Sequence, residues 1–308
     1  MMQFPLIILG AAGNLGRHLC EEALAQGISP LLLTRTACDL SDRAAVKAGL
    51  SSLRDRLSEV GPGARIVNAA AYTDVDGAEA EADLAFLVNG LAVGALATAA
   101  RDHGAWLCHV STDFVFDGRA ARPYDEFDVP APLSVYGRSK RAGELLLAQS
   151  GAESALCRVA GLYGRHGRNF VSTLLPRLQA GEALRLDAER LVQPTFARAA
   201  ARVILDLASA RERGTFHLTC GGATTWHGFA QALAEGAAAR GVSLPGTFAA
   251  VPTAALATPA PRPAQSLLER RVLRLWGLPD MPDWQEALAA YLDEALVPAA
   301  QTEKEKRT

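Results

Sequence analysis

The hydrophobic and polar positions in the first half of the chain alternate between two periods. Short apolar runs are separated by longer stretches in which apolar residues recur every three or four positions, which is typical of strands joined by helices in a parallel sheet. The predicted strands are Pro5–Gly10, Pro30–Thr34, Ala64–Asn68, Ala105–Ser111 and Ala155–Ala160. The predicted helices are Asn14–Gln26, Asp42–Ser58, Ala78–His103 and Val135–Ala148, each long enough to cross over between parallel strands. This pattern predicts an α/β fold with a doubly wound parallel sheet.

The pattern changes after Val159. Glycine and arginine gather at residues 161–168, and proline, alanine and threonine at 245–263, with no comparable run of strands. Residues 195–219 nevertheless have the pattern of one more helix and strand that return to the sheet. We therefore predict two interleaved domains, a cofactor-binding sheet domain (1–158 and 195–220) and a smaller α/β substrate domain (159–194 and 221–296), followed by a flexible charged tail (297–308).

Composition and charge make several classes of function improbable. The chain has 31 basic and 33 acidic residues and a net charge of −2, so nothing indicates a nucleic acid or a membrane surface as partner. No uninterrupted apolar run approaches the roughly 18 residues of a transmembrane helix, and the N-terminus has no secretory signal pattern. The five cysteines have no C-x-x-C spacing and the six histidines no metal-ligand spacing, which favours reduced thiols and predicts no metal site. We expect a cytoplasmic protein.

The first predicted strand runs into a glycine-rich turn. Gly10, Gly13 and Gly16 form a G-x-x-G-x-x-G pattern that opens a helix through Asn14 and Leu15. Without side chains, such a turn lets backbone N–H groups and the helix N-terminus approach a pyrophosphate. A plain strand–helix turn is the structural alternative, but the position directly after a strand favours dinucleotide binding.

The end of the second predicted strand indicates which dinucleotide is bound. An NAD-specific site would place an acidic residue there, whereas this chain has Arg35, whose cation suits the 2′-phosphate of NADPH. Asp39, next to Leu40, is expected either to contact the adenine end of the cofactor or to cap the following helix. The sequence therefore favours NADPH and leaves NADH possible.

A tyrosine and a lysine four residues apart give the clearest indication of chemistry. Tyr136 and Lys140 share one face of a predicted helix, and a lysine cation beside a phenol lowers its pKa from about 10, so that the tyrosine becomes a usable general acid. Upstream, Thr112 and Asp113 follow a predicted strand, at the edge where open α/β sheets bind ligands. Thr112 is expected to bond a substrate carbonyl, although these groups could instead only cap a loop.

Taken together, these motifs resemble the extended short-chain dehydrogenase/reductase superfamily and, within it, the dTDP-4-dehydrorhamnose reductase (RmlD-like) family. The resemblance runs from Gly10 to about Leu292. Besides the glycine turn, it rests on the segments 68–76, 88–89, 111–116, 132–140, 224–226 and 258–263.

The resemblance implies a Rossmann fold and reduction by NADPH of the 4-keto group of a nucleotide-linked 6-deoxy sugar. In that reaction Tyr136 would protonate the C4 oxygen, Lys140 would bind the nicotinamide ribose, and Thr112, supported by Asp113, would orient the ketone. The resemblance also implies cofactor-binding positions at Ala69, Ala70, Ala71 and Asn89.

Several residues depart from related patterns or are less certain. Phe114 stands where sugar-nucleotide 4,6-dehydratases similarly use a carboxyl group for elimination, which favours simple reduction. Gly161 stands where the family commonly has a tryptophan that walls the substrate pocket, so the exact sugar stays open. Arg262 is a candidate for the substrate diphosphate, or else for holding a proline-rich loop. Some family members hold magnesium between subunits, but the matching residues are His18 and Arg198, which are poor magnesium ligands.

Three functions therefore remain open. The first is the 4-ketoreductase described above, acting as a monomer or homodimer. The second is a relative that reduces a different ketone in natural-product sugar biosynthesis. The third is a non-catalytic NADP-binding regulatory subunit similar to the β subunit of methionine adenosyltransferase, against which the intact Tyr136, Lys140 and Thr112 argue.

Overall fold

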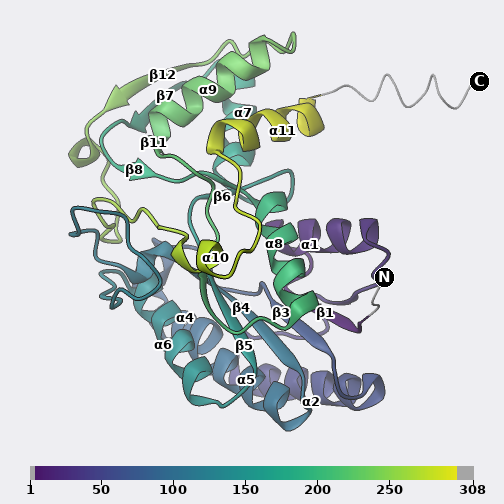
Figure 1. Ribbon diagram of the computed structural model, residues 1–308. Helices are drawn as coiled ribbons and strands as arrows, with labels where there is room; N and C mark the ends of the chain where they lie inside the picture. The colour runs from purple at the N-terminus through teal and green to yellow at the C-terminus, as the bar shows by residue number, and fades with distance from the viewer. Residues whose placement is uncertain (1–3, 297–308) are drawn as a thin grey trace, which may run out of the picture.

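A six-stranded parallel sheet forms the centre of the larger lobe. The computed structural model describes residues 4–296, so the predicted flexible tail lies outside the described residues. The strands lie in the order β10-β5-β4-β3-β1-β2, and the predicted doubly wound sheet is confirmed (Figure 1). Their bounds are β1 Leu6–Leu9, β2 Leu31–Leu33, β3 Arg65–Asn68, β4 Trp106–Thr112, β5 Ser154–Val159 and β10 Gly214–His217.

Helices cover both faces of this sheet. One face packs against α1 (Asn14–Ala25) and α8 (Ala197–Ala210), the other against α2 (Arg43–Val60), α5 (Ala92–Asp102) and α6 (Val135–Gln149). The strands are therefore enclosed on both sides, and β4 is buried at all seven positions. The chain order changes direction between β1 and β3, the place where open α/β sheets bind ligands at the carboxyl ends of their strands.

The stretch expected as one helix over 78–103 is interrupted. It consists of α3 (Gly77–Ala80), α4 (Ala82–Phe86), a π-helical turn (Leu87–Leu91) and α5. The wide turn carries Asn89, whose side chain bonds both the backbone N–H and the carbonyl of Tyr72 and the Ser139 hydroxyl. By length and hydropathy the span Ala82–Asp102 would suffice to cross a membrane, but core helices pass the same test, and 44% of its 18-residue apolar window is buried inside the protein.

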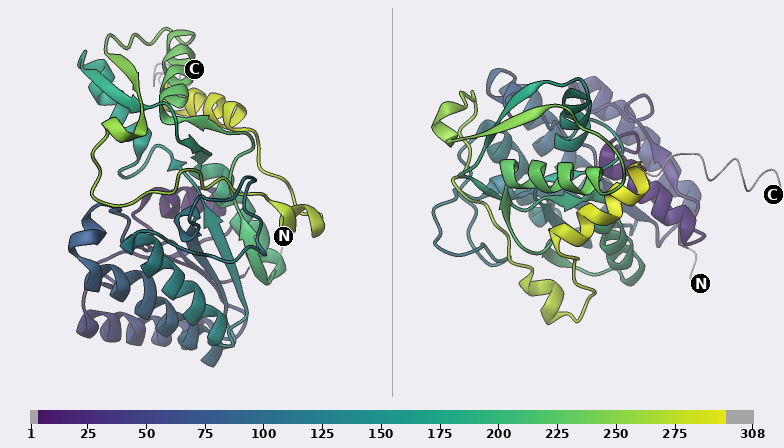
Figure 2. Two further views of the ribbon diagram at one scale, coloured as in Figure 1. Left: turned by 90° about the vertical axis from the view of Figure 1, so that its left-hand side faces the viewer. Right: turned by 90° about the horizontal axis from the view of Figure 1, so that it is seen from above.

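The smaller lobe sits over the carboxyl ends of the strands (Figure 2). The expectation that this region has no comparable run of strands is wrong, because it contains three two-stranded pairs whose strands are only two to five residues long. Such short pieces have too few positions to display an alternating pattern. The pairs are β7 (Ala183–Asp187) with β12 (Thr247–Val251), β8 (Leu191–Val192) with β11 (Thr224–Thr225), and β6 (Leu162–Tyr163) with β9 (Thr195–Phe196).

Three helices complete this part of the described molecule, α7 (Phe170–Gln179), α9 (Trp226–Ala238) and α11 (Trp284–Leu296), whereas the short α10 (Arg271–Leu275) packs against β10 of the large sheet. Between them, α8 and β10 return to the larger lobe, where β10 pairs in parallel with β5. The chain therefore leaves the smaller lobe for the sheet and returns to it.

Candidate active site

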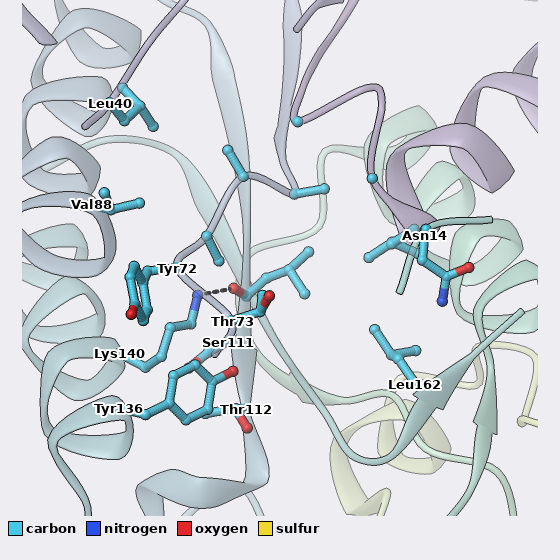
Figure 3. A pocket seen from close by; sticks show the side chains of 18 of the residues that line it. Asn14, Leu40, Tyr72, Thr73, Val88, Ser111, Thr112, Tyr136, Lys140 and Leu162 are labelled. Atoms are coloured by element: carbon cyan, nitrogen blue, oxygen red, sulfur yellow. Dashed lines mark hydrogen bonds between the residues drawn. The ribbon is translucent and has the colours of Figure 1, made fainter. Parts of the chain in front are cut away.

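A cleft of about 780 Å³ lies at the carboxyl ends of the strands (Figure 3). Its walls come from the turn after β1, the segment after β3, the end of β4, helix α6 and the loops on either side of β6. A volume of this size is within the range of ligand-binding pockets.

The glycine turn forms one end of the cleft. Gly10 has a φ of +72°, and a side chain there would bring its Cβ within 2.6 Å of the backbone nitrogen of Ala70. Gly16 has no room for a Cβ beside the carbonyl of Gly10, so it keeps helix α1 close to the turn and does not line the cleft. Helix α1 begins after Gly13 with no side-chain cap and no acidic residue in its first turn. Its first N–H groups are therefore suited to a phosphate group.

Arg35 and Asp39 line the region beyond β2. The Arg35 side chain is 77% exposed and its Nε lies 3.4 Å from Asp39 Oδ1. Asp39 accepts a hydrogen bond from the Ser41 backbone, and the hydrogen bonds from Ser41 lower the pKa of its carboxyl, with Arg35 adding to this effect. The structure thus places the exposed Arg35 cation at the rim of the cleft, beside Asp39.

Helix α6 presents Tyr136 and Lys140 to the same cleft. The helix begins after Ser134, whose hydroxyl accepts a hydrogen bond from the Gly137 N–H at 3.1 Å. Lys140 is 2% exposed, and its Nζ donates to the carbonyl oxygen of Val110 at 2.6 Å. Burial lowers the pKa of Lys140 to about 8, against the opposing charge of Glu144.

His109 lies behind this lysine, and its tautomer follows from its neighbours. Asn68 Oδ1 accepts a hydrogen bond from the Ala70 N–H, so the Asn68 amide must donate to His109 Nδ1 at 3.1 Å. Burial and the nearby Lys140 lower the pKa of His109 well below its ordinary value, so the neutral ring carries its proton on Nε2. His109 Nε2 is 3.5 Å from Lys140 Nζ. Because its N–H points a partial positive charge at the lysine, it favours the neutral amine over the ammonium ion.

Burial also has the largest effect on the pKa of Tyr136. The pKa of Tyr136 is raised to about 12, first by burial and then by Asp113, while the Thr112 hydroxyl lowers it. The expectation that Lys140 lowers this pKa is therefore wrong for the protein without cofactor, because the lysine is directed toward Val110 and burial dominates. A phenol that keeps its proton at neutral pH can still donate it to a developing alkoxide.

Thr112 and Asp113 form a buried hydroxyl–carboxyl pair at the end of β4. The Thr112 hydroxyl donates to Asp113 Oδ1 at 3.0 Å, and the Ser266 hydroxyl bonds the other carboxyl oxygen. Burial raises the pKa of Asp113 to about 6, although these hydrogen bonds oppose the shift. Through these two hydrogen bonds Asp113 orients the Thr112 side chain and connects the end of β4 to the segment that carries Ser266.

A buried ion pair anchors helix α6 to the sheet. Glu144 of α6 binds Arg158 of β5 through two hydrogen bonds of 3.0 and 2.9 Å, and accepts a third from the Ser111 hydroxyl at 2.6 Å. Burial opposes ionisation, but Arg158 and its other partners hold the pKa of Glu144 below its ordinary value.

Most of the residues predicted from the sequence meet in this one cleft. Those that line it are Gly10, Gly13, Asn14, Leu15, Arg35, Asp39, Leu40, Ala69, Ala70, Ala71, Thr112, Asp113, Tyr136, Lys140 and Gly161. Gly161 has a φ of +54°, and a Cβ there would lie 2.9 Å from the carbonyl of Gln193, so this backbone is built for glycine and not for the tryptophan of related sequences.

Four other predicted residues lie outside the cleft wall: Gly16, Asn89, Phe114 and Arg262. Asn89 accepts a hydrogen bond from the backbone N–H of Tyr72, in the segment after β3. The Phe114 ring packs edge-on against the Tyr136 ring, with 5.9 Å between the ring centroids. Arg262 forms a two-pronged ion pair with Asp76, at 3.0 and 2.8 Å, so the structure favours the alternative in which it holds the proline-rich loop.

Sequence reasoning missed part of the wall. Tyr72 and Thr73 directly follow the three alanines, so their place after a strand was a usable signal. Gly167 and Arg168 belong to the glycine- and arginine-rich segment noted above, but nothing local indicated that this loop folds back over the glycine turn. Glu81, Leu84 and Val88 reach the cleft only because the helical stretch is interrupted.

A doubly wound sheet, a glycine turn against an uncapped helix, and a tyrosine–lysine pair in one cleft define an oxidoreductase of the extended short-chain dehydrogenase/reductase type. The family model described as RmlD substrate binding domain matches residues 2–297. The chain belongs to this family.

Several relatives are similar along nearly their whole length. The dTDP-4-dehydrorhamnose reductase of Burkholderia thailandensis is 36% identical, with 94% of this chain and 99% of that protein covered. The spore coat polysaccharide biosynthesis protein SpsK of Bacillus subtilis is 32% identical, with 94% and 97% covered. A crystal structure of dTDP-4-dehydrorhamnose reductase from Bacillus anthracis in complex with NADP superimposes with a TM-score of 0.87, 32% identity and 95% and 100% coverage.

Proposed function

We propose that this protein reduces the 4-keto group of a nucleotide-linked 6-deoxy sugar of the dTDP-4-dehydrorhamnose type, with NADPH as the reductant. The observation that carries the proposal is the presence of Tyr136, Lys140 and Thr112 in the same cleft as the glycine turn. The relatives named dTDP-4-dehydrorhamnose reductase and the related structure with NADP support the choice of substrate and cofactor.

Three residues of the chain have separate roles in the proposed reduction. Bound NADPH supplies the hydride that reduces the carbonyl carbon. Thr112, whose hydroxyl proton goes to Asp113 in the cofactor-free protein, would turn that proton to the ketone oxygen and so orient it, and Tyr136, which keeps its proton at neutral pH, donates that proton to the oxygen as negative charge develops on it. Lys140 approaches the same space from one turn further along α6, where its amine can bond the ribose of the cofactor.

Reduction is favoured over elimination because the residue that directly follows Asp113 has no carboxyl group. The next side chain, Phe114, is apolar and packs against the Tyr136 ring. It cannot take up the proton that a dehydration requires, so this position supports reduction and not elimination.

The test follows NADPH oxidation at the nicotinamide absorbance with dTDP-4-dehydrorhamnose generated in situ. Wild type is expected to turn over, and Tyr136→Phe is expected to lose about 10²- to 10⁴-fold in rate, the usual contribution of a general acid. Tyr291→Phe, which removes a hydroxyl from a buried tyrosine of α11 outside the cleft, serves as the matched control and should keep wild-type activity.

Two outcomes would overturn parts of the proposal. Turnover of other keto sugars but not of this one would sink the substrate assignment and keep the chemistry. NADPH binding without turnover of any keto sugar, combined with stable association with a larger catalytic protein, would favour the regulatory subunit.

A further inference from the structure

Two histidines and a glutamate that are far apart in the sequence meet beside the glycine turn. His18 and Glu21 lie one turn apart on α1, and His166 comes from the loop between β6 and α7. Their ligand atoms all lie within 4.8 Å of one another, and the two imidazole centroids are 4.9 Å apart. His166 Nε2 is 2.8 Å from one carboxyl oxygen of Glu21, and His18 Nδ1 is 3.4 Å from the other.

His18 is unusual because it is fully buried and makes no side-chain hydrogen bond within the described part of the chain, although Glu21 lies 3.4 Å away. Its exposed fraction is 0%, and neither ring nitrogen has a hydrogen-bond partner among residues 4–296. Buried polar groups in proteins are almost always bonded, so such a side chain indicates a partner of another kind.

We propose that His18, Glu21 and His166 bind a transition-metal dication of the zinc class. Two imidazoles and one carboxylate form a donor set that zinc accepts in proteins, with a fourth position left for water. Magnesium prefers an all-oxygen shell, so it suits this set poorly. The ligands converge without rearrangement of the backbone, because two of them are fixed on one helix face and the third already touches the carboxylate.

The surrounding charges are compatible with this site. Arg165 contacts Glu21 at 3.2 Å, but its side chain is 37% exposed and can turn toward solvent when the carboxylate takes a cation. Arg198 lies on the same face of α1, where it is held by Glu22, one turn after His18, and by Glu294, and it contacts none of the three ligand atoms. One exposed arginine is therefore the group that a metal ion must displace.

The proposed metal site lies between helix α1 and the loop of the smaller lobe that follows β6. Gly164 packs so closely that a Cβ there would lie 2.5 Å from His18 Nε2 and 2.6 Å from Asn14 Oδ1. The same loop continues into Gly167 and Arg168, which line the cleft. A bound ion would therefore fasten a loop of the smaller lobe to the helix that opens with the glycine turn.

The test uses tag-free full-length protein that has been dialysed against a chelator. Titration with Co²⁺, followed by visible absorption, and with Zn²⁺, followed by calorimetry and by the unfolding temperature, is expected to show one equivalent bound and a rise in that temperature. His166→Gln is the key variant, because this partly exposed loop residue can be replaced without emptying a core position. It should weaken binding at least about 100-fold, more than the loss of an outer hydrogen-bond partner costs.

His103→Gln, on a histidine at the end of α5 far from the cluster in sequence, is the matched control and should bind as wild type does. Equal binding by wild type and His166→Gln would overturn the proposal, as would a cobalt spectrum with thiolate charge-transfer bands, since Cys20 on the same helix is a free thiol. A wild type that takes up neither ion would overturn it as well.

Discussion

Replacing Lys140 with methionine is expected to change how the stability of the cofactor-free protein depends on pH. The lysine is 2% exposed, and burial lowers its pKa to about 8 from an ordinary value of 10.5. Below pH 8 the lysine is charged in both the folded and the unfolded chain, so the folded protein bears the full cost of burying the charge. Between pH 8 and 10.5 the unfolded chain binds more protons than the folded one, and the stability of wild type rises with pH.

The size of the effect follows from the same two values. Each pKa unit corresponds to about 1.4 kcal/mol. The difference between the Lys140 pKa of about 8 in the folded protein and 10.5 in the unfolded chain therefore corresponds to roughly 3 kcal/mol of unfolding free energy. Methionine has a similar length and does not titrate. The unfolding free energy of Lys140→Met minus that of wild type should therefore fall by roughly 3 kcal/mol between pH 7 and about pH 10.5.

Urea unfolding at a series of pH values, followed by circular dichroism, measures this difference. Lys47→Met, which removes an exposed lysine from α2, should stay within about 0.5 kcal/mol of wild type throughout. A difference between Lys140→Met and wild type that is flat across this pH range would refute the reasoning, because it would mean that the buried amine does not lose its proton on folding.

Three further predictions concern other parts of the site. Glu144→Gln leaves the buried Arg158 without its counter-charge and should lower the unfolding free energy by about 3 kcal/mol in urea, whereas Glu59→Gln in the exposed pair with Arg56 should cost under about 1 kcal/mol. Arg35→Ala should raise the NADPH KM roughly tenfold and leave the NADH KM nearly unchanged; equal effects on both would argue against a 2′-phosphate contact. Gly10→Ala should abolish cofactor binding in fluorescence titrations, because its Cβ would meet Ala70.

The sheet and most of the cleft could be predicted because each depends on local patterns. Five strands and the glycine turn have short-range signatures, and the order of motifs along the chain brings Tyr136, Lys140 and Thr112 to one edge once the parallel sheet is assumed. The π-helical turn that carries Asn89 has no such signature, since it arises from contacts with Tyr72 and Ser139 that are made only in the folded protein.

The errors have a common physical origin in long-range contacts. The sequence left Arg262 open between a phosphate and the proline-rich loop, because it does not show that the fold places Asp76 opposite this arginine, nearly two hundred residues away in the sequence. The direction of the pKa shift of Tyr136 was wrong because a sequence shows a neighbouring charge but not the depth of burial. The cluster of His18, Glu21 and His166 could not be predicted from the spacing of residues in the sequence, because His166 comes from a distant loop of the smaller lobe.

The interleaving of the two lobes also affects how the chain is made. Strand β5 is complete when Val159 leaves the ribosome, but the strand that covers its outer edge, β10, ends at His217, ~58 residues later. At about 5–20 residues per second the nascent chain therefore carries an open, largely apolar strand edge for roughly 3–12 seconds. We expect this interval to make recovery of soluble protein sensitive to the rate of translation and to chaperone supply, even though the finished sheet has its β5 edge closed.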